Sequence, residues 1–333
     1  MNFLNNGINR RRFIKIIGLS GIGAVTGGIL VNMQDKPLHK VNWQGIALGA
    51  PSDITLFHHN KKEAQEILNK SIKQISHLEN LFSLYKNDSQ LSILNRDGFY
   101  NNPDKEMIKL FNLSIQYSAL TEGAFDITVQ PLWQLYNKSF SENRMPPKVK
   151  DINKILDLIN WKSIEVSENK INYTNKGMSA TLNGIAQGYI TDKVTETFIN
   201  YGVNNTLIQL GEYRAIGKHP DDRKWKLLLS NPEHNASIGE IEFENAAIAT
   251  SAGKGTSFDQ DGIYHHIFNP KDGLSSNNIL QATVTAKSAT EADALATSFL
   301  IMNEDKSSKL AKKNGIGLEI FNNNRERKVI TTL

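Results

Sequence analysis

Apolar and polar residues recur with two different periods along the chain, and the period distinguishes predicted helices from predicted strands. Between residues 61 and 82, apolar side chains return every three or four positions, which places them on one face of a helix. The same reasoning, with Pro, Gly and capping signals at the ends, predicts helices over residues 104–120, 188–201 and 290–302. Short β-rich runs predict strands over residues 46–57 (interrupted at 49–51), 206–210, 226–229, 240–243, 247–250, 265–268, 282–286, 316–321 and 328–332.

The order of these elements indicates the fold class. Strands and helices come in runs and do not alternate strictly, which favours an α+β fold over a doubly wound parallel sheet. The 333 residues allow one large domain or two ordinary ones. We therefore expect mixed sheets with packed helices, in two lobes that share one site.

The excess of positive charge lies in the first residues of the chain. The sequence carries 38 Lys and Arg against 34 Asp and Glu, a formal charge of +4. Residues 1–31 contain Arg10, Arg11, Arg12 and Lys15 and no acid, so the rest of the chain is formally neutral. A neutral mature chain argues against a nucleic-acid partner. The sequence has no cysteine, which excludes disulfides, thiolate metal sites, a cysteine nucleophile and lipidation at cysteine.

The basic segment is followed by an apolar run over residues 16–31, which is short for a membrane span. A positive segment before such a run is typical of an export signal, and the consecutive arginines indicate the twin-arginine route. We expect residues 1–35 to be this signal and residues 36–333 to be a periplasmic domain. A membrane tether formed by the uncleaved signal is the alternative.

Two polar residues in the apolar helix at 290–302 are the first candidates for chemistry. Asp293 and Thr297 lie four residues apart and so share one face of that helix. A carboxylate and a hydroxyl supply the oxygen ligands that Mg²⁺ prefers. An Asp that caps or pairs with a neighbour would account for the same pattern, because an acid among buried alanines needs a partner.

Three further segments are candidates for ligand binding. Residues 181–189 form a glycine-spaced turn before a helix, where backbone N–H groups suit a phosphate. Residues 123–126 place small residues beside Phe125 and Asp126, which suits a flat ring. Adjacent histidines at 265 and 266 precede a turn, and alternation predicts that one is buried in the core while the other faces outward.

Five separated blocks, taken in order, resemble the FAD:protein FMN transferases, the flavin transferases that attach FMN to other proteins. Each block is unspecific by itself, whereas five in order over about residues 43–302 are specific. The blocks are residues 47–51, 82–95, 121–128, 182–189 and 250–297.

The resemblance implies an activity. FAD would bind with Mg²⁺ on its diphosphate, a threonine hydroxyl of a target flavoprotein would attack the FMN-side phosphorus, and AMP would leave. The block at 181–188, with the leader, is similar to the flavin transferases associated with nitrous-oxide respiration, which implies a membrane-bound electron-transfer subunit as target.

The resemblance also implies roles for individual residues. The metal ligands would be Asp293, Thr297 and the Gly184 carbonyl. His266 would deprotonate the incoming threonine or orient a phosphate. The expected FAD contacts are Leu48, Ser83, Leu84, Tyr85, Ala124, Phe125, Asp126, Thr181, Gln187 and Ile267.

Some positions depart from the commoner family pattern. Thr181 and Asn269 are neutral where the family usually has acids, and Gln187 stands where it usually has Lys or Glu. These departures predict a less negative site that binds Mg²⁺ or FAD less tightly. They leave open a flavin carrier that binds FAD without transfer, and an FAD pyrophosphatase in which water replaces threonine.

Overall fold

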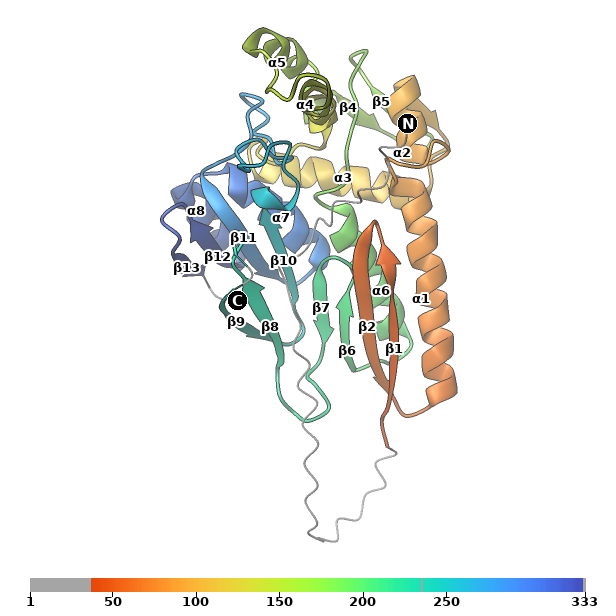
Figure 1. Cartoon of the computed structure of the whole chain (residues 1–333). Helices are drawn as coiled ribbons and strands as arrows, with labels where there is room; N and C mark the ends of the chain where they lie inside the picture. Colours follow the sequence, from red (N-terminus) through yellow and green to blue (C-terminus); the bar gives the residue numbers. More distant parts are fainter. Residues whose placement is uncertain (1–36, 235, 332–333) are drawn as a thin grey trace, which may run out of the picture.

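The computed structural model describes residues 37–234 and 236–331 (Figure 1). The predicted export signal over residues 1–35 lies outside them. Among the helices that the structure describes, none combines the length and the apolar composition of a membrane span.

An eight-stranded sheet forms the centre of the molecule, in the order β1-β2-β6-β7-β10-β11-β12-β13. Every neighbouring pair in it is antiparallel, which confirms the α+β class and excludes a doubly wound parallel sheet here. In that order the strands are His39–Ala47, Ala50–His58, Asn205–Gln209, Tyr213–Ile216, Ala247–Ala252, Ile279–Ala286, Gly317–Asn322 and Arg327–Thr331.

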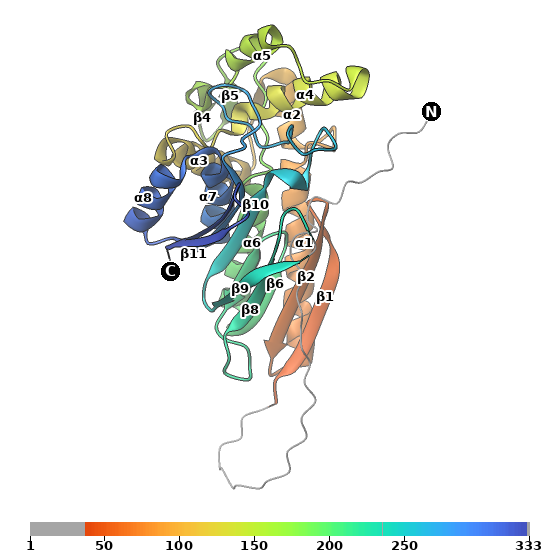
Figure 2. The ribbon, with the colours of Figure 1, turned by 60° about the vertical axis from the view of Figure 1, so that its left-hand side comes forward.

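Three helices pack along one face of this sheet, and a hairpin covers part of the other. The helices are α1 (Lys61–Phe82), α6 (Ala186–Asn200) and α7 (Ala289–Ile301), and α6 lies between the other two. The hairpin is β8 (Trp225–Ser230) with β9 (Ser237–Phe243), seen in front of β6 in Figure 2. Consecutive residues Leu207 and Ile208 of β6 join different hydrophobic clusters, because side chains alternate between the two faces of a strand.

The remaining elements gather at one end of the sheet or beyond its last strands (Figure 1). The first group contains the helices α2, α3, α4 and α5 and a small three-stranded sheet, and α8 packs against β12 and β13. These elements are α2 (Gln90–Asp97), β3 (Phe99–Asn101), α3 (Lys105–Leu120), α4 (Gln130–Asn143), α5 (Val149–Leu156), β4 (Ile164–Val166), β5 (Lys170–Tyr173) and α8 (Glu304–Asn314).

The predicted helices and most predicted strands are confirmed, and two predictions need correction. The interrupted strand at 46–57 is a hairpin, because Leu48 and Gly49 both take positive φ (47° and 72°) and reverse the chain between β1 and β2. The predicted strand at 265–268 is wrong. Only isolated bridges are present there, from His265 to Ser257 and from Phe268 to Ser275.

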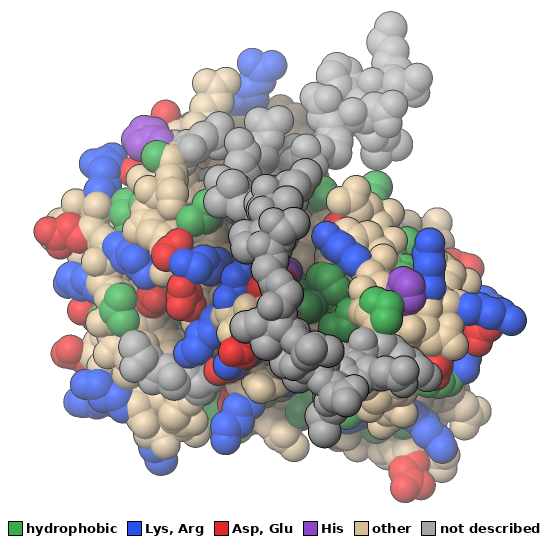
Figure 3. Space-filling view, turned by 90° about the horizontal axis from the view of Figure 1, so that it is seen from below, with side chains coloured by type: hydrophobic (Ala, Val, Ile, Leu, Met, Phe, Trp, Pro, Cys, Tyr) green, Lys and Arg blue, Asp and Glu red, His purple; other side chains and the backbone are tan. Residues whose placement is uncertain are grey.

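Charged side chains are mixed over the face shown in Figure 3. Lys and Arg lie among Asp and Glu on this face and do not form a patch of one sign. Ion pairs of this exposed kind, such as Lys226 with Glu242, contribute little to stability.

The helices α6 and α7 approach each other so closely that one residue of α6 has no room for a side chain. A Cβ placed on Gly188 would lie 2.2 Å from the carbonyl oxygen of Ala289 and 2.8 Å from the Cβ of Asp293. The first of these atoms is backbone, so a larger residue would force the helices apart. The position of Asp293 relative to α6 therefore depends on a glycine at 188.

We predict that Gly188→Ala destabilises the protein by about 1–3 kcal/mol, the usual cost of overpacking a core. Helix propensity alone would stabilise the same variant by up to about 1 kcal/mol, because alanine is the better helix former. The free energy of unfolding, measured by urea titration, separates the two effects by their sign. A more stable variant would contradict the close approach of the helices.

Candidate active site

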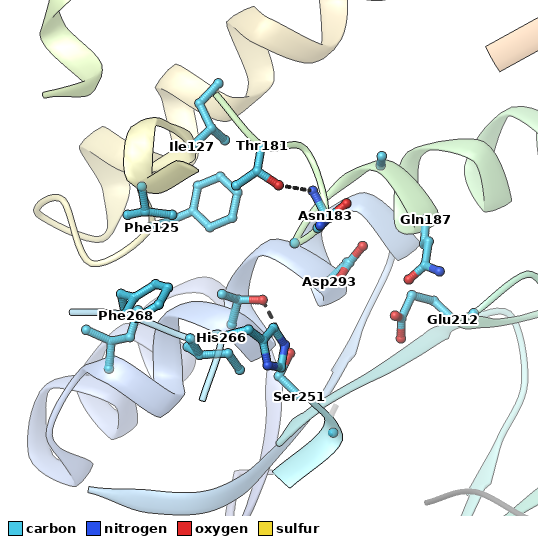
Figure 4. Close-up of a pocket in the computed structure, with 18 of the residues that line it drawn as sticks. Phe125, Ile127, Thr181, Asn183, Gln187, Glu212, Ser251, His266, Phe268 and Asp293 are labelled. Carbon is cyan, nitrogen blue, oxygen red and sulfur yellow. Dashed lines mark hydrogen bonds between the residues drawn. The ribbon is translucent and has the colours of Figure 1, made fainter. Parts of the chain in front are cut away.

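One pocket is lined by residues from many separate segments of the chain. It is lined by the β1–β2 turn, the end of α1, residues 124–133, the segment 181–187, the β6–β7 turn, β10, the loop that follows β10, and α7 (Figure 4). The two largest hydrophobic clusters, one centred on α1 and α6 and the other on α7, both contribute to its wall. The pocket therefore lies where distant parts of the chain converge.

The structure brings most of the predicted site residues to this wall. The residues that line it are Leu48, Ala124, Phe125, Asp126, Thr181, Gly184, Gln187, His266, Ile267, Asp293 and Thr297. Their convergence from four of the five sequence blocks agrees with one shared site. Their individual roles stay predictions.

Ser83, Leu84 and Tyr85 are not among the residues that line the pocket. The Ser83 hydroxyl accepts the N–H groups of Tyr85 and Lys86, and the Ser83 carbonyl accepts the Ser89 hydroxyl, which fixes the connection between α1 and α2. Tyr85 is 76% exposed. These contacts give Ser83 a structural task, and contact of the three residues with FAD stays a prediction.

The oxygen donors expected for a metal lie together on the wall formed by α6 and α7. A Cβ on Gly184 would lie 3.1 Å from Thr297 Oγ1, so the Gly184 backbone and this hydroxyl are neighbours. Thr297 Oγ1 is also 3.3 Å from the hydroxyl of Ser251. Asp293, one helical turn before Thr297, is 3% exposed, and its Oδ2 accepts the Gly188 N–H at 3.0 Å.

These donors suit Mg²⁺ by their chemistry. They are a carboxylate, a hydroxyl and a backbone carbonyl, all oxygen, and Mg²⁺ is typically held by one or two carboxylates together with substrate phosphates and water. Among the described residues, no three His, Asp or Glu side chains come together as a closed metal site. The set therefore fits an ion that shares its coordination with a bound diphosphate.

The structure shows the pairing suggested for Asp293, whereas its role as a metal ligand stays a prediction. Its hydrogen bond to Gly188 is the pairing that a buried acid needs. The same carboxylate lines the pocket beside Thr297, as a metal ligand would. Asp293 therefore both pairs with α6 and lines the pocket.

The opposite part of the wall is largely apolar and is organised by Asp126. Phe125, Ile127 and Phe268 line it (Figure 4). Burial raises the pKa of Asp126, while donors oppose this shift: the Thr128 hydroxyl at 2.6 Å, the Thr128 N–H at 2.8 Å and the Trp161 N–H at 3.1 Å. These bonds fix the backbone that presents Phe125 to the pocket.

The two adjacent histidines have different surroundings. His265 is buried, its Nε2 donates to the Ser276 carbonyl at 2.7 Å, and its Nδ1 accepts the Ile267 N–H at 3.3 Å. His266 lines the pocket, and its Nδ1 lies 3.0 Å from the Thr256 carbonyl. A carbonyl only accepts, so Nδ1 carries the proton and a neutral His266 ring has Nε2 as its basic nitrogen.

The pocket holds a carboxylate that the sequence analysis missed. Glu212, in the turn between β6 and β7, is only 2% exposed and lies beside Gln187 and near Asp293 (Figure 4). Ser251 of β10 is a second missed residue. The sequence predicted the strand before Glu212, at 206–210, but not the strand β7 that begins at Tyr213, so the turn that holds Glu212 was not foreseen.

Two residues bear on the charge of the site, Glu212 and Asn269. Asn269 does not line the pocket. Its side chain bonds Asp272 at 2.7 Å and the Lys271 N–H at 3.1 Å within a turn. Thr181 does line the pocket, where its hydroxyl accepts the Asn183 N–H at 3.3 Å. Thr181 is thus a neutral residue of the pocket, Asn269 lies outside it, and Glu212 is an acidic residue within it.

Comparison with known proteins identifies relatives over most of the chain. The model of the ApbE family matches residues 48–321. A protein of Vibrio cholerae named FAD:protein FMN transferase is 28% identical over 297 residues, covering 85% of this chain and 87% of that protein. A Haemophilus influenzae protein of the same name is 25% identical over 326 residues, covering 91% and 92%.

Solved structures share the fold. The flavin transferase ApbE from Vibrio cholerae superposes with a TM-score of 0.77 at 24% identity, over 88% of this chain and 96% of that one. The apo form of the Pseudomonas stutzeri flavinyl transferase ApbE gives a TM-score of 0.77 at 22% identity, over 89% and 95%.

We predict that His265 makes stability depend on pH. Burial is the main cause that lowers the pKa of His265, so the folded chain resists its protonation. Stability is therefore full above the ordinary histidine pKa of about 6.5 and is lost as pH falls through the lower folded value. His265→Gln should flatten the dependence of unfolding free energy on pH below about 6.5 by up to roughly 1.4 kcal/mol per pH unit.

Urea titrations at several pH values measure this slope. The exposed His234 provides the control, as His234→Gln. Equal flattening in both variants would show that burial of His265 is not the cause.

Proposed function

Because this chain belongs to the ApbE family, we propose that it is a Mg²⁺-dependent FAD:protein FMN transferase that moves FMN from FAD to a threonine hydroxyl of a target flavoprotein and releases AMP. The observation that carries this proposal is the two-sided pocket. Oxygen donors from α7 and from the turn before α6 form one side, and aromatic and aliphatic side chains form the other. FAD has a flat apolar ring system and a charged diphosphate, which match the two sides.

The flavin ring would pack on the apolar side. Ala124 and Phe125 offer a small residue next to an aromatic ring, and Asp126 holds their backbone in place. Offset packing of aromatic rings contributes about 0.5–1.5 kcal/mol beyond the area it buries. This side would fix the FMN half of the substrate.

The diphosphate would face Asp293, Thr297 and the Gly184 carbonyl, which would hold Mg²⁺ between protein and substrate. When bound, the ion neutralises charge on the diphosphate and on the departing AMP. Glu212 adds a second buried acidic side chain to this end of the pocket.

The transfer itself needs one proton acceptor. The threonine oxygen of the target bonds to the FMN-side phosphorus, the bond from that phosphorus to the bridging oxygen breaks, and AMP leaves with the bridging oxygen. The hydroxyl proton must go to a base as the new phosphoester forms. His266 lines the pocket with Nε2 as its basic nitrogen, and we assign it this task.

We infer the compartment of the reaction from the predicted export signal. We propose that residues 1–35 direct the protein to the periplasm by the twin-arginine route, which exports folded proteins. The target would then be a flavoprotein exposed on that side of the membrane, of the electron-transfer kind that the subgroup resemblance implies. Both statements rest on the sequence alone.

We predict that Asp293→Asn lowers the rate of Mg²⁺-dependent transfer at least about 100-fold, because it removes the charged donor, and loss of groups that merely support a metal ligand already costs 10–100-fold. The assay incubates the protein with FAD, Mg²⁺ and a target domain, and follows the gain of one FMN on threonine by mass spectrometry. Asp305→Asn, on the exposed side of α8, is the matched control and should keep the wild-type rate.

The same assay separates the proposal from its alternatives. Release of AMP together with FMN on the target supports transfer. FAD binding without AMP release would show a flavin carrier, and AMP with free FMN and an unmodified target would show a pyrophosphatase. Either of these two results, obtained with several family-type targets, would overturn the proposed function.

A further inference from the structure

The helices α6 and α7 are joined by reciprocal hydrogen bonds, in which each helix presents a carboxylate to the backbone of the other. Asp192 of α6 accepts the N–H groups of Ala289 and Thr290, both at 2.8 Å, and the Thr290 hydroxyl at 2.5 Å. Asp293 of α7 accepts the Gly188 N–H of α6 at 3.0 Å. These hydrogen bonds are made at and next to the close contact of Gly188 with α7.

We propose that Asp192 is a positioning residue for the metal donors. It fixes the start of α7 against α6, so that Asp293 and Thr297 stand at the correct distance from Gly184. This inference rests on the proposed function, because it assigns to those three residues the binding of Mg²⁺. Asp192 is not among the residues that line the pocket, so it acts through α7.

The spacing of the contacts supports this role. The two helices run antiparallel, and three contacts follow one another along α7: Asp192 with Ala289, Gly188 with Asp293, and Gly184, in the turn just before α6, with Thr297. Along α7 each contact level is four residues, about 6 Å, from the next. A displacement at the first level is therefore transmitted along a rigid helix to the donors at the other two.

The local cap of α7 does not provide the same link. Among the first N–H groups of α7, the Ser288 hydroxyl accepts that of Glu291, and those of the first two helical residues go to Asp192. A helix needs such acceptors for its first N–H groups. Ser288 satisfies one of them within its own helix, whereas Asp192 satisfies two from a neighbouring helix.

Two charged side chains lie near Asp192 besides the N-terminus of α7. Arg214 of β7 has a buried guanidinium whose Nε and Nη1 have no hydrogen-bond partner among the described residues. Burial lowers the pKa of Arg214, and the attraction of Asp192 opposes this shift. Glu291 is the like-charged neighbour: burial first, and then Asp192, raise its pKa. A carboxylate at the N-terminus of α7 also suits the helix dipole.

The test measures Mg²⁺ binding to the purified protein in the presence of FAD, by calorimetry, without any target. Asp192→Asn should raise the dissociation constant for Mg²⁺ by roughly 10–100-fold, the usual effect of losing a group that positions a metal ligand. Hydrogen exchange of the segment 184–192 should accelerate, because Gly188 loses its fixed acceptor. Thr290→Val removes only one of the three donors and should raise the constant by a few fold.

Two other capping variants are the matched controls. Ser288→Ala removes the local cap of α7, and Asn303→Ala removes the cap of α8, where its side chain accepts the Lys306 N–H. Both should lower the melting temperature yet keep wild-type affinity for Mg²⁺.

The outcomes separate this inference from the proposed function. Wild-type Mg²⁺ affinity in Asp192→Asn, or equal weakening in Ser288→Ala, would overturn the positioning role. If Asp192→Asn does not fold, unchanged affinity in Thr290→Val overturns it instead. A wild-type protein that binds Mg²⁺ and FAD but modifies no target overturns the proposed function alone, and one that does not bind Mg²⁺ overturns both.

Discussion

The close contact between α6 and α7 at Gly188 is the constraint on which the rest of the site depends. The two helices come from segments about a hundred residues apart in the chain, and the absence of a side chain at 188 lets the backbone of one approach the other. Carboxylates then reach across the contact in both directions. Protein interiors are packed tightly enough that a shift of one helix here moves every group attached to it.

The contact also explains how polar groups can stand inside an apolar core. Asp293 is surrounded by alanines and leucine on its own helix, and burying a carboxylate without a partner is costly. The Gly188 N–H provides that partner from α6. The same arrangement brings Asp293, Thr297 and Gly184 to one wall of the pocket, while the antiparallel sheet carries Glu212 and Ser251 to it from β6–β7 and β10.

Sequence patterns predicted the helices α1, α3, α6 and α7, but not α4 with 14 residues or α8 with 11. Over residues 61–82 the apolar face is repeated through many turns, and the predicted helix is the observed α1. The helices α2 and α5 have only eight residues each, and α5 has no side chain that caps its start, so their signals were too short to read. The predicted strand at 265–268 failed because His265 finds its partners at Ser275 and Ser276 in a loop, not in the sheet.

Site residues could be predicted where spacing along one helix brings them together. They could not be predicted where contacts between distant elements bring them together. Asp293 and Thr297 were found because four residues bring them to the same helical face. Glu212 was missed because its place in the pocket depends on how β6 pairs with β7. Asn269 is close in sequence to residues that line the pocket, but a hydrogen bond within its turn holds its side chain against Asp272. The resemblance to flavin transferases supplied the connection between these segments, and the pocket agrees with it.

The most direct test of the account is a crystal structure of the protein with FAD and Mg²⁺. We expect the flavin ring against Phe125, and the metal ion at about 2.1 Å from oxygens of Asp293, Thr297 and Gly184, with the diphosphate completing its coordination. A structure with FAD bound outside this pocket, or with the ion held by other residues, would contradict it.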